Sequence, residues 1–274
     1  MNLSRETGTM AKSFGAINVD ESGGIHTITL NRPERRNALN PQMIGELSEA
    51  LETAEHCSCG AVVLTGAGKA FCSGMDLEHL RVQGRQRPED QRDDLEAFMW
   101  VMRRLYDFPK PTIAAVNGAA MAGGFGLATL CDFTIAADSA VFGYTEVRVG
   151  FIPAIVAVFL VAMVGEKRTR QLLLAGWPLA SEEALAMGLV TELTTAQQLI
   201  PRTREIATAL MRNSPESMRQ IKKLLGRFSK ERLDHDLRAA LQLSERVRNS
   251  PDFQEGIQAF LQKRAPVWSR REQP

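Results

Sequence analysis

Short apolar runs that end in glycine-rich turns mark the first two thirds of the chain. Residues 14–30 alternate in polarity on both sides of Ser22-Gly23-Gly24, a pattern that predicts a β-hairpin. Over residues 41–54 the apolar positions recur at helical spacing after an Asn-Pro start signal, which predicts a helix. Residues 61–65 are apolar and β-branched and lead into Gly66-Ala67-Gly68, so a buried strand and a turn are expected.

The same order of a strand, a loop of small residues and a helix then occurs again. Residues 112–116 predict a strand, 118–124 a loop and 125–131 a helix, and another strand is expected over 133–136. Alternation of strands and helices at this pitch indicates parallel strands joined by helical crossovers.

The remaining segments are polar or helical. Residues 81–94 are polar and charged and predict a surface loop, which precedes a helix over 95–106. Strand signals stop after Ser181, and helices are expected over 183–187, 195–212, 215–228, 231–248 and 252–262. We therefore expect a core over residues 14–200 and a helical C-terminal region over 201–274.

The composition is that of an ordinary globular protein with one large domain. The 274 residues carry 33 Lys and Arg against 32 Asp and Glu, a net charge of +1, so no basic field favours nucleic acid or an anionic membrane. Residues 111–131 are uncharged, but Pro111, Asn117 and four glycines argue against a membrane helix. Since the first fourteen residues lack the apolar block of a secretion signal, we expect a cytoplasmic protein.

The four cysteines do not predict a metal site. His56, Cys57 and Cys59 form the only His/Cys cluster in the sequence. A zinc site would need a second pair of ligands at a comparable spacing, and the chain has no other Cys-x-Cys or close histidine pair. We therefore expect no bound metal.

Two loops rich in small residues, 70–77 and 117–126, are candidates for chemistry. Each follows a buried strand and leads into a helix, where a glycine lets a backbone N–H group face a ligand. Two converging N–H groups would form an oxyanion hole; the alternative is that the glycines only permit tight turns and packing. Residues 66–71 match neither the dinucleotide fingerprint nor a P-loop, so nucleotide binding is not expected.

Glu146 is the candidate acid or base. From Pro111 to Gly165 the only charged residues are Asp132, Asp138, Glu146 and Arg148. Desolvation among apolar neighbours would raise the pKa of Glu146 toward the range useful in general acid–base catalysis. The alternative is a structural ion pair with Arg148, which would share its face on a strand. Asp76, Asp132 and Asp138 are expected to cap helices or stabilise turns.

Several motifs then occur together in an order that is typical of one family. They are Asn31-Arg32-Pro33-Glu34 with Asn37-Ala38-Leu39, residues 70–77, Asn117-Gly118 with Gly123-Gly124, Phe142-Gly143 with Glu146, Gly150-Phe151-Ile152-Pro153, and Ala175-Gly176 with Gly188-Leu189-Val190. Over roughly residues 14–263 the chain thereby resembles the enoyl-CoA hydratase/isomerase (crotonase) superfamily. The resemblance implies an α/β fold, a spiral of repeated ββα units followed by a helical trimerisation region.

The resemblance implies an enzyme that acts on acyl-CoA thioesters, with coenzyme A as part of the substrate and no other cofactor. By motif position, the N–H groups of Met75 and Gly123 would hold the thioester oxygen and stabilise enolate charge. Glu146 matches the family glutamate that delivers or removes the substrate proton. Binding of the acyl-CoA would involve Ala38, through its backbone, together with Ser73, Gly74, Met75, Asp76, Leu77 and Gly123.

The same resemblance makes Arg35, Arg36 and Lys263 candidates for the CoA phosphates, with an ordinary solvated charge as the alternative for each. It also implies a homotrimer or homohexamer. A different class of function, a non-catalytic or RNA-associated family member, conflicts with the balanced charge.

One position departs from the usual hydratase pattern. The usual hydratase has a second glutamate that helps to activate water, and Gly126 stands there instead. We expect an enoyl-CoA hydratase, the commonest activity of the family, with a single-glutamate Δ3-Δ2 enoyl-CoA isomerase as the alternative. A glycine beside the acyl site would also leave room for a branched acyl group such as methylglutaconyl.

Overall fold

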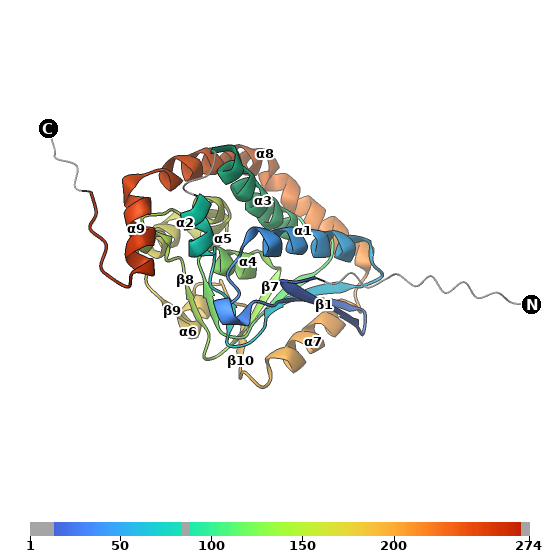
Figure 1. The fold of residues 1–274 in the computed structure, drawn as a ribbon. Coiled ribbons are helices and arrows are strands. Elements are labelled where there is room, and N and C mark those ends of the chain that lie inside the picture. The colour runs from blue at the N-terminus through green and yellow to red at the C-terminus, as the bar shows by residue number, and fades with distance from the viewer. Residues whose placement is uncertain (1–13, 84–87, 270–274) are drawn as a thin grey trace, which may run out of the picture.

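The computed structural model describes residues 14–83 and 88–269, which form two sheets surrounded by helices (Figure 1). The larger sheet has the strand order β1 (Ile17–Ser22), β2 (Ile25–Leu30), β3 (Ala61–Gly66), β5 (Thr112–Val116), β7 (Phe133–Ala137) and β10 (Glu192–Thr194). The smaller sheet has the order β4 (Ala70–Cys72), β6 (Ala119–Met121), β8 (Val141–Gly143) and β9 (Leu179–Ala180). β1 is antiparallel to β2, and β9 is antiparallel to β8; the other neighbouring strands are parallel.

A repeated ββα unit connects the two sheets. β3, β5 and β7 lie in the larger sheet, and the strand that follows each of them, β4, β6 or β8, lies in the smaller one. Helices come next: α2 (Leu77–Gln83) and α3 (Pro88–Tyr106) after β4, α4 (Gly123–Leu130) after β6, and α5 (Ala154–Ala175) after β8. The expected α/β spiral of ββα units is confirmed.

Helices cover both faces of the larger sheet. On one face α1 (Pro41–His56), α3 and α4 enclose the main core, in which Leu47, Val101 and Leu127 are buried together with Ile28 of β2. On the other face α7 (Leu199–Leu210) packs on β3, β5 and β7. This two-sided cover explains why these strands are nearly continuous apolar runs.

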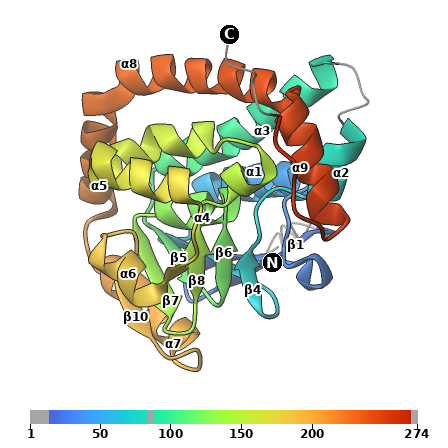
Figure 2. The same cartoon turned by 90° about the vertical axis from the view of Figure 1, so that its left-hand side faces the viewer.

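The C-terminal helices lie over the outside of the repeats. After the short α6 (Ser181–Ala186), β10 and α7, the long helix α8 (Pro215–Arg248) packs against α3 and α5 (Figure 2). α9 (Pro251–Leu261) contacts α2 and the short 3-10 helix η2 (Glu146–Val149); a second one, η1 (Pro33–Arg35), follows β2. None of the helices in the described residues has the length and apolarity needed to span a bilayer.

Four predictions from the sequence are wrong. The loop expected over residues 118–124 contains the strand β6 and the first two residues of α4. The loop expected over residues 81–94 is helical where it is described, because residues 81–83 end α2 and residues 88–94 begin α3; residues 84–87 lie outside the description. The helices expected over 215–228 and 231–248 form the single helix α8, since no glycine or proline separates them. β10 was missed because three residues are too few to show strand alternation.

Asn37 ties the turn after β2 to the loop that leads into β4. Its side chain is fully buried, and Nδ2 lies within hydrogen-bond distance of the carbonyl oxygens of Ala67 (3.0 Å), Ala70 (2.8 Å) and Phe71 (3.1 Å). Its Oδ1 accepts the N–H group of Arg32 at 2.9 Å. Asn37 also has a φ of +55°, a conformation that asparagine adopts more readily than most residues. This one side chain therefore fixes the turn after β2 against the start of the first candidate loop.

We expect Asn37→Ala to lower the free energy of unfolding by about 2–3 kcal/mol, because buried carbonyl oxygens would lose their donor. Urea denaturation followed by circular dichroism measures the loss. Asn249→Ala is the matched control, since Asn249 is exposed and its Nδ2 donates to a carbonyl oxygen at the end of α8. A loss for Asn37→Ala no larger than that of the control would contradict this role.

Candidate functional site

A cavity of about 590 Å³ lies where the loops after the smaller sheet meet the C-terminal helices. Among the residues predicted for the site, five line it: Ser73, Met75, Leu77, Gly123 and Glu146. Gly74 and Asp76 alternate with the lining residues of the first loop. Ala38 does not line the cavity; it is buried one residue before Leu39, which forms a β-bridge with Met75. The structure therefore brings both predicted loops and Glu146 to one place.

The two small-residue loops approach each other at backbone distance. A Cβ atom placed on Gly74 would lie only 2.8 Å from the Cβ of Ala122 and 3.5 Å from the amide nitrogen of Gly123. Gly74 also has a φ of +87°, which a larger residue rarely adopts. This is why the small residues of both loops are needed.

The N–H groups of Met75 and Gly123 have no acceptor among the described residues. Leu39 bonds instead to the residues on either side of Met75. Its N–H donates to the oxygen of Gly74 at 2.8 Å, and its oxygen accepts from Asp76 N at 2.9 Å. Gly123 begins α4, and the first N–H groups of a helix lack an intrahelical acceptor. Two backbone donors thus border one cavity, an arrangement able to bind a carbonyl or enolate oxygen.

Ala122, which directly precedes Gly123, has a strained backbone conformation. It has a φ of +51° and a ψ of −130° and precedes the first residue of α4. Its N–H donates to the oxygen of Gly143 at 2.7 Å, and its oxygen accepts from Gly126 N at 3.1 Å. Such a conformation costs a non-glycine residue about 1–3 kcal/mol.

Glu146 has the environment of an acid or base rather than of an ion pair. It begins η2, and its Oε2 is inaccessible to solvent with no hydrogen-bond partner among the described residues. Burial raises the pKa of its carboxyl group from 4.5 to about 7. The alternative pairing with Arg148 is not observed: in a 3-10 helix of three residues per turn, positions i and i+2 do not share a face, and Arg148 is exposed.

The position of Glu146 depends on the C-terminal helix α9. A Cβ on Gly150, which ends η2 with a φ of +67°, would collide with the backbone oxygen of Asp252. A Cβ on Gly256 of α9 would collide with the backbone of Val149. The two backbones therefore pack directly on each other, and α9 supports the turn that carries Glu146.

The predicted capping and turn roles are confirmed for Asp76 and Asp138; Asp132 is also structural, but it holds the start of β5 instead of capping a helix or a turn. Asp76 caps α2, since its Oδ1 accepts the N–H of Glu78 at 3.2 Å, and its Oδ2 accepts from both terminal nitrogens of Arg32 at 3.1 Å. Asp132 accepts from the N–H (2.8 Å) and the hydroxyl group (3.0 Å) of Thr112. Asp138 lies in the turn between β7 and β8.

The candidates for binding coenzyme A phosphates differ in their surroundings. Arg36 lines the cavity and is exposed. Arg35 forms an ion pair with Glu78 at 3.3 Å, and Lys263 is exposed just after α9. The carbonyl oxygen of Ala38 accepts a hydrogen bond from Arg32 Nη1 at 2.6 Å, so this backbone segment is held rigidly.

The expected free space at Gly126 is absent. A Cβ at this position would lie 2.7 Å from Cε of Met102 and 2.8 Å from Cγ2 of Val156. The volume that a larger residue would occupy is thus filled by these two side chains. Gly126 gives no room for a branched acyl group, and that reason for expecting one was wrong.

α8 and α9 also contribute to the cavity, which was not predicted from the sequence. Ser244 and Arg248 of α8 line it, together with Phe253 and Phe260 of α9. Arg248 is buried, and burial lowers the pKa of its guanidinium group to about 10, opposed by the charge of Asp94. A signal was present: Leu233, Leu237, Ala240 and Leu241 form a buried helical stripe that Ser244 and Arg248 continue.

The histidine and cysteine cluster of the structure differs from the cluster of His56, Cys57 and Cys59 in the sequence. The histidine beside Cys57 and Cys59 is His26, whereas His56 is exposed and lies outside this group. The sulfur atoms of Cys57 and Cys59 form a disulfide.

Comparison with known proteins gives consistent matches. The family model described as enoyl-CoA hydratase/isomerase matches residues 20–271. A Thermus thermophilus protein provisionally named an enoyl-CoA hydratase is 42% identical over 90% of this chain and 98% of its own length. A hydroxycinnamoyl-CoA hydratase-lyase of Pseudomonas fluorescens is 34% identical over 89% of this chain and 91% of its own. A solved enoyl-CoA hydratase/isomerase of Xanthobacter autotrophicus matches with a TM-score of 0.85 and 31% identity, covering 91% of this chain and 94% of that one.

We expect Ala122→Gly to raise the free energy of unfolding by about 1 kcal/mol, because glycine relieves the backbone strain but adds entropy to the unfolded chain. Scanning calorimetry measures the change. Ala209→Gly is the matched control, since Ala209 is exposed within α7. This substitution should lower the free energy of unfolding by about 1 kcal/mol. Equal destabilisation of both variants would contradict the strain at Ala122.

Glu146→Gln should change how stability depends on pH. Because the folded pKa of Glu146, about 7, exceeds its ordinary value of 4.5, stability from this group is present at low pH and is lost as pH rises through 7. Between about pH 5 and pH 8, the free energy of unfolding of the wild type should fall by about 1–3 kcal/mol relative to that of Glu146→Gln. Urea denaturation across this range tests it, with Glu166→Gln, an exposed residue of α5, as control. A difference between wild type and Glu146→Gln that stays constant with pH would overturn the assignment.

Proposed function

Because the chain belongs to the enoyl-CoA hydratase/isomerase family, we propose that this acyl-CoA enzyme catalyses the reversible addition of water to a 2-enoyl-CoA. The observation that carries the proposal is the shared cavity, where two backbone donors and a desolvated carboxyl group occur together. The names of the relatives, which are hydratases, support this reaction over others in the family.

The N–H groups of Met75 and Gly123 bind the thioester oxygen of the substrate. As water adds to the β-carbon, electron density moves onto this oxygen, and fixed donors stabilise the resulting enolate more than the neutral thioester. Removing one such donor typically costs about 3–4 kcal/mol of transition-state stabilisation. Ser73, Gly74, Asp76 and Leu77 hold the first donor in place, and Ala38 contributes backbone contacts to the CoA moiety.

Glu146 moves the proton. As a carboxylate it accepts a proton from water while the oxygen bonds to the β-carbon, and as a carboxylic acid it then gives this proton to the α-carbon. The product gains one hydroxyl group and one hydrogen, and the carboxylate is regenerated. A pKa of about 7 suits both steps, because both forms are populated near neutral pH.

A single carboxylate also suits a second reaction. Since Gly126 occupies the position of the usual second glutamate, Glu146 could shuttle one proton between two carbons of the acyl chain. That chemistry would convert a 3-enoyl-CoA into the conjugated 2-enoyl-CoA without water. The Δ3-Δ2 isomerase is therefore the second candidate function.

We also propose a homotrimer or homohexamer, as expected for the family. Support comes from apolar side chains left exposed on α8 and at the end of α5, namely Ile221, Leu224, Leu225 and Phe228 with Leu174 and Trp177. A second copy of the chain could cover them. A cytoplasmic location stays a prediction of the sequence.

The two reactions are separated by incubating the protein with crotonyl-CoA and with a 3-enoyl-CoA of similar length. Hydratase activity is expected: the absorbance of the conjugated crotonyl thioester should fall, and mass spectrometry should show the addition of one water. Glu146→Gln should lower kcat by about 10²–10⁴-fold, whereas Glu166→Gln should leave it unchanged. Isomerisation of the 3-enoyl substrate without hydration of crotonyl-CoA would overturn the hydratase proposal.

A further inference from the structure

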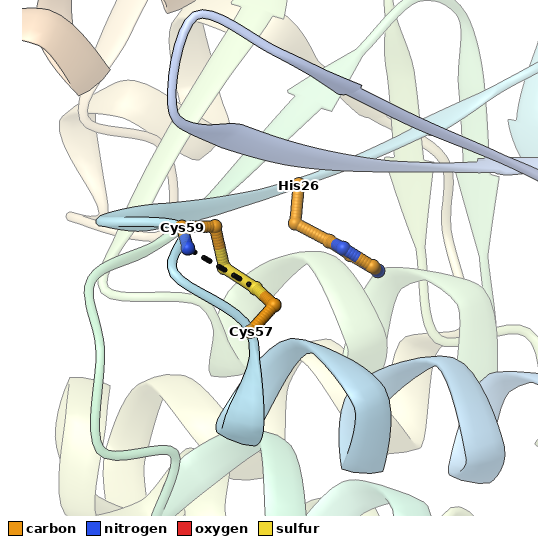
Figure 3. A group of neighbouring side chains, drawn as sticks. All are labelled: His26, Cys57 and Cys59. Atoms are coloured by element: carbon orange, nitrogen blue, oxygen red, sulfur yellow. Dashed lines mark hydrogen bonds between the residues drawn. A yellow bond between two sulfur atoms is a disulfide. The ribbon is translucent and has the colours of Figure 1, made fainter. Parts of the chain in front are cut away.

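A buried histidine lies beside two cysteines at the C-terminal end of α1, which is the end away from the cavity. A ring nitrogen of His26 and the sulfur atoms of Cys57 and Cys59 all lie within 4.8 Å of one another (Figure 3). Three soft donors at this spacing are the first requirement of a site for a thiophilic metal ion. α1 has 16 residues and so separates this cluster from the Met75 loop by about 24 Å. The cluster is independent of the catalytic cavity.

His26 is prepared as a ligand. It is fully buried, Nδ1 lies 2.8 Å from a carboxylate oxygen of Glu21, and Nε2 has no hydrogen-bond partner among the described residues. If the Nδ1–H donates to Glu21, Nε2 carries a lone pair that no donor among the described residues engages. A carboxylate behind the imidazole is the usual second partner of a histidine that binds a metal.

A backbone donor and an ammonium group lie beside the two sulfurs. Cys59 N donates to the sulfur of Cys57 at 3.2 Å, and Lys110 Nζ lies 3.5 Å from the sulfur of Cys59 and 3.8 Å from that of Cys57. Cys59 is buried, and Cys57 is partly exposed, which gives an ion access from one side. The sulfurs are joined in the structure, but a bridge around the single residue Ser58 restricts the unfolded chain little.

We propose that the reduced chain binds one Zn²⁺ ion through His26, Cys57 and Cys59, with water completing the tetrahedron. A dithiol reductant opens the disulfide by supplying two electrons and two protons, and the two thiols lose these protons when they bind the metal. The sulfurs must then separate to about 3.8 Å, the spacing in a tetrahedral site with Zn–S bonds of about 2.3 Å. The charges balance: two thiolates offset Zn²⁺, and Glu21 offsets Lys110.

The ion connects His26 to Cys57, which stands 31 positions later in the chain. It would fasten β2 to the segment between α1 and β3. It therefore stabilises the fold and does not take part in the acyl-CoA reaction. Oxidation of the two cysteines and metal binding exclude each other.

The test uses the full chain, reduced with a phosphine, stripped by a chelator, mixed with ZnCl₂ and desalted before elemental analysis. One zinc per chain and a raised Tm are expected. Replacement by Co²⁺ should give the near-ultraviolet absorption of thiolate-to-cobalt charge transfer. Chain oxidised beforehand with a disulfide oxidant should retain no metal.

Variants identify the ligands. His26→Gln, Cys57→Ser and Cys59→Ser should each lose the bound zinc, whereas His56→Gln, which changes the neighbouring exposed histidine, should retain it. Catalytic activity of each variant shows that it is folded, since the cavity lies elsewhere. If the reduced wild type holds no more zinc than the double variant Cys57→Ser/Cys59→Ser, the site does not exist. Its failure would leave the proposed hydration untouched.

Discussion

The structure depends on the approach of two backbone loops to a distance at which no ordinary side chain fits. Gly74, in a left-handed conformation, lies there against Ala122 and the oxygen of Met121. The parallel pairing of β4 with β6 places the loops side by side, and α4 begins at the point of contact. The buried turn network of Asn37, the cap at Asp76 and the strained Ala122 all serve to hold this geometry. A binding site made of backbone atoms needs such support, because no side chain can adjust to correct it.

Glu146 adds a second constraint, which opposes stability. Its carboxyl oxygen is buried without a partner, an arrangement that costs free energy when the group is charged. Pairing it with Arg148 would remove that cost and would also fix the group as a carboxylate. The 3-10 turn, held by α9, keeps the two apart. Under the proposed mechanism, function and stability are in conflict at this residue, and burial leaves a carboxyl group that titrates near neutrality.

The sequence predicted what local signals encode. Local spacing predicted the Asn40-Pro41 start of α1 and the strands β3 and β5. It also located both small-residue segments, although it missed the short strands β4 and β6 within them. The pairing of Met75 with Gly123 is what the family motifs imply. Contacts between residues far apart in the sequence could not be predicted from these local patterns. The role of His26 arises from the register of β2 on β3, which places it next to Val62 and thus near Cys59. The space at Gly126 is filled by Met102 and Val156 from two other helices, which no local pattern reveals.

The packing of α9 on η2 has a consequence for synthesis of the chain on the ribosome. Glu146 and both backbone donors lie in the first 146 residues, but Phe253 and Phe260 of α9 complete the lining of the cavity. Until these last residues leave the exit tunnel, the apolar wall of the cavity has no cover. During synthesis the apolar wall of the cavity is therefore exposed to solvent from the time its own residues emerge until α9 packs on η2.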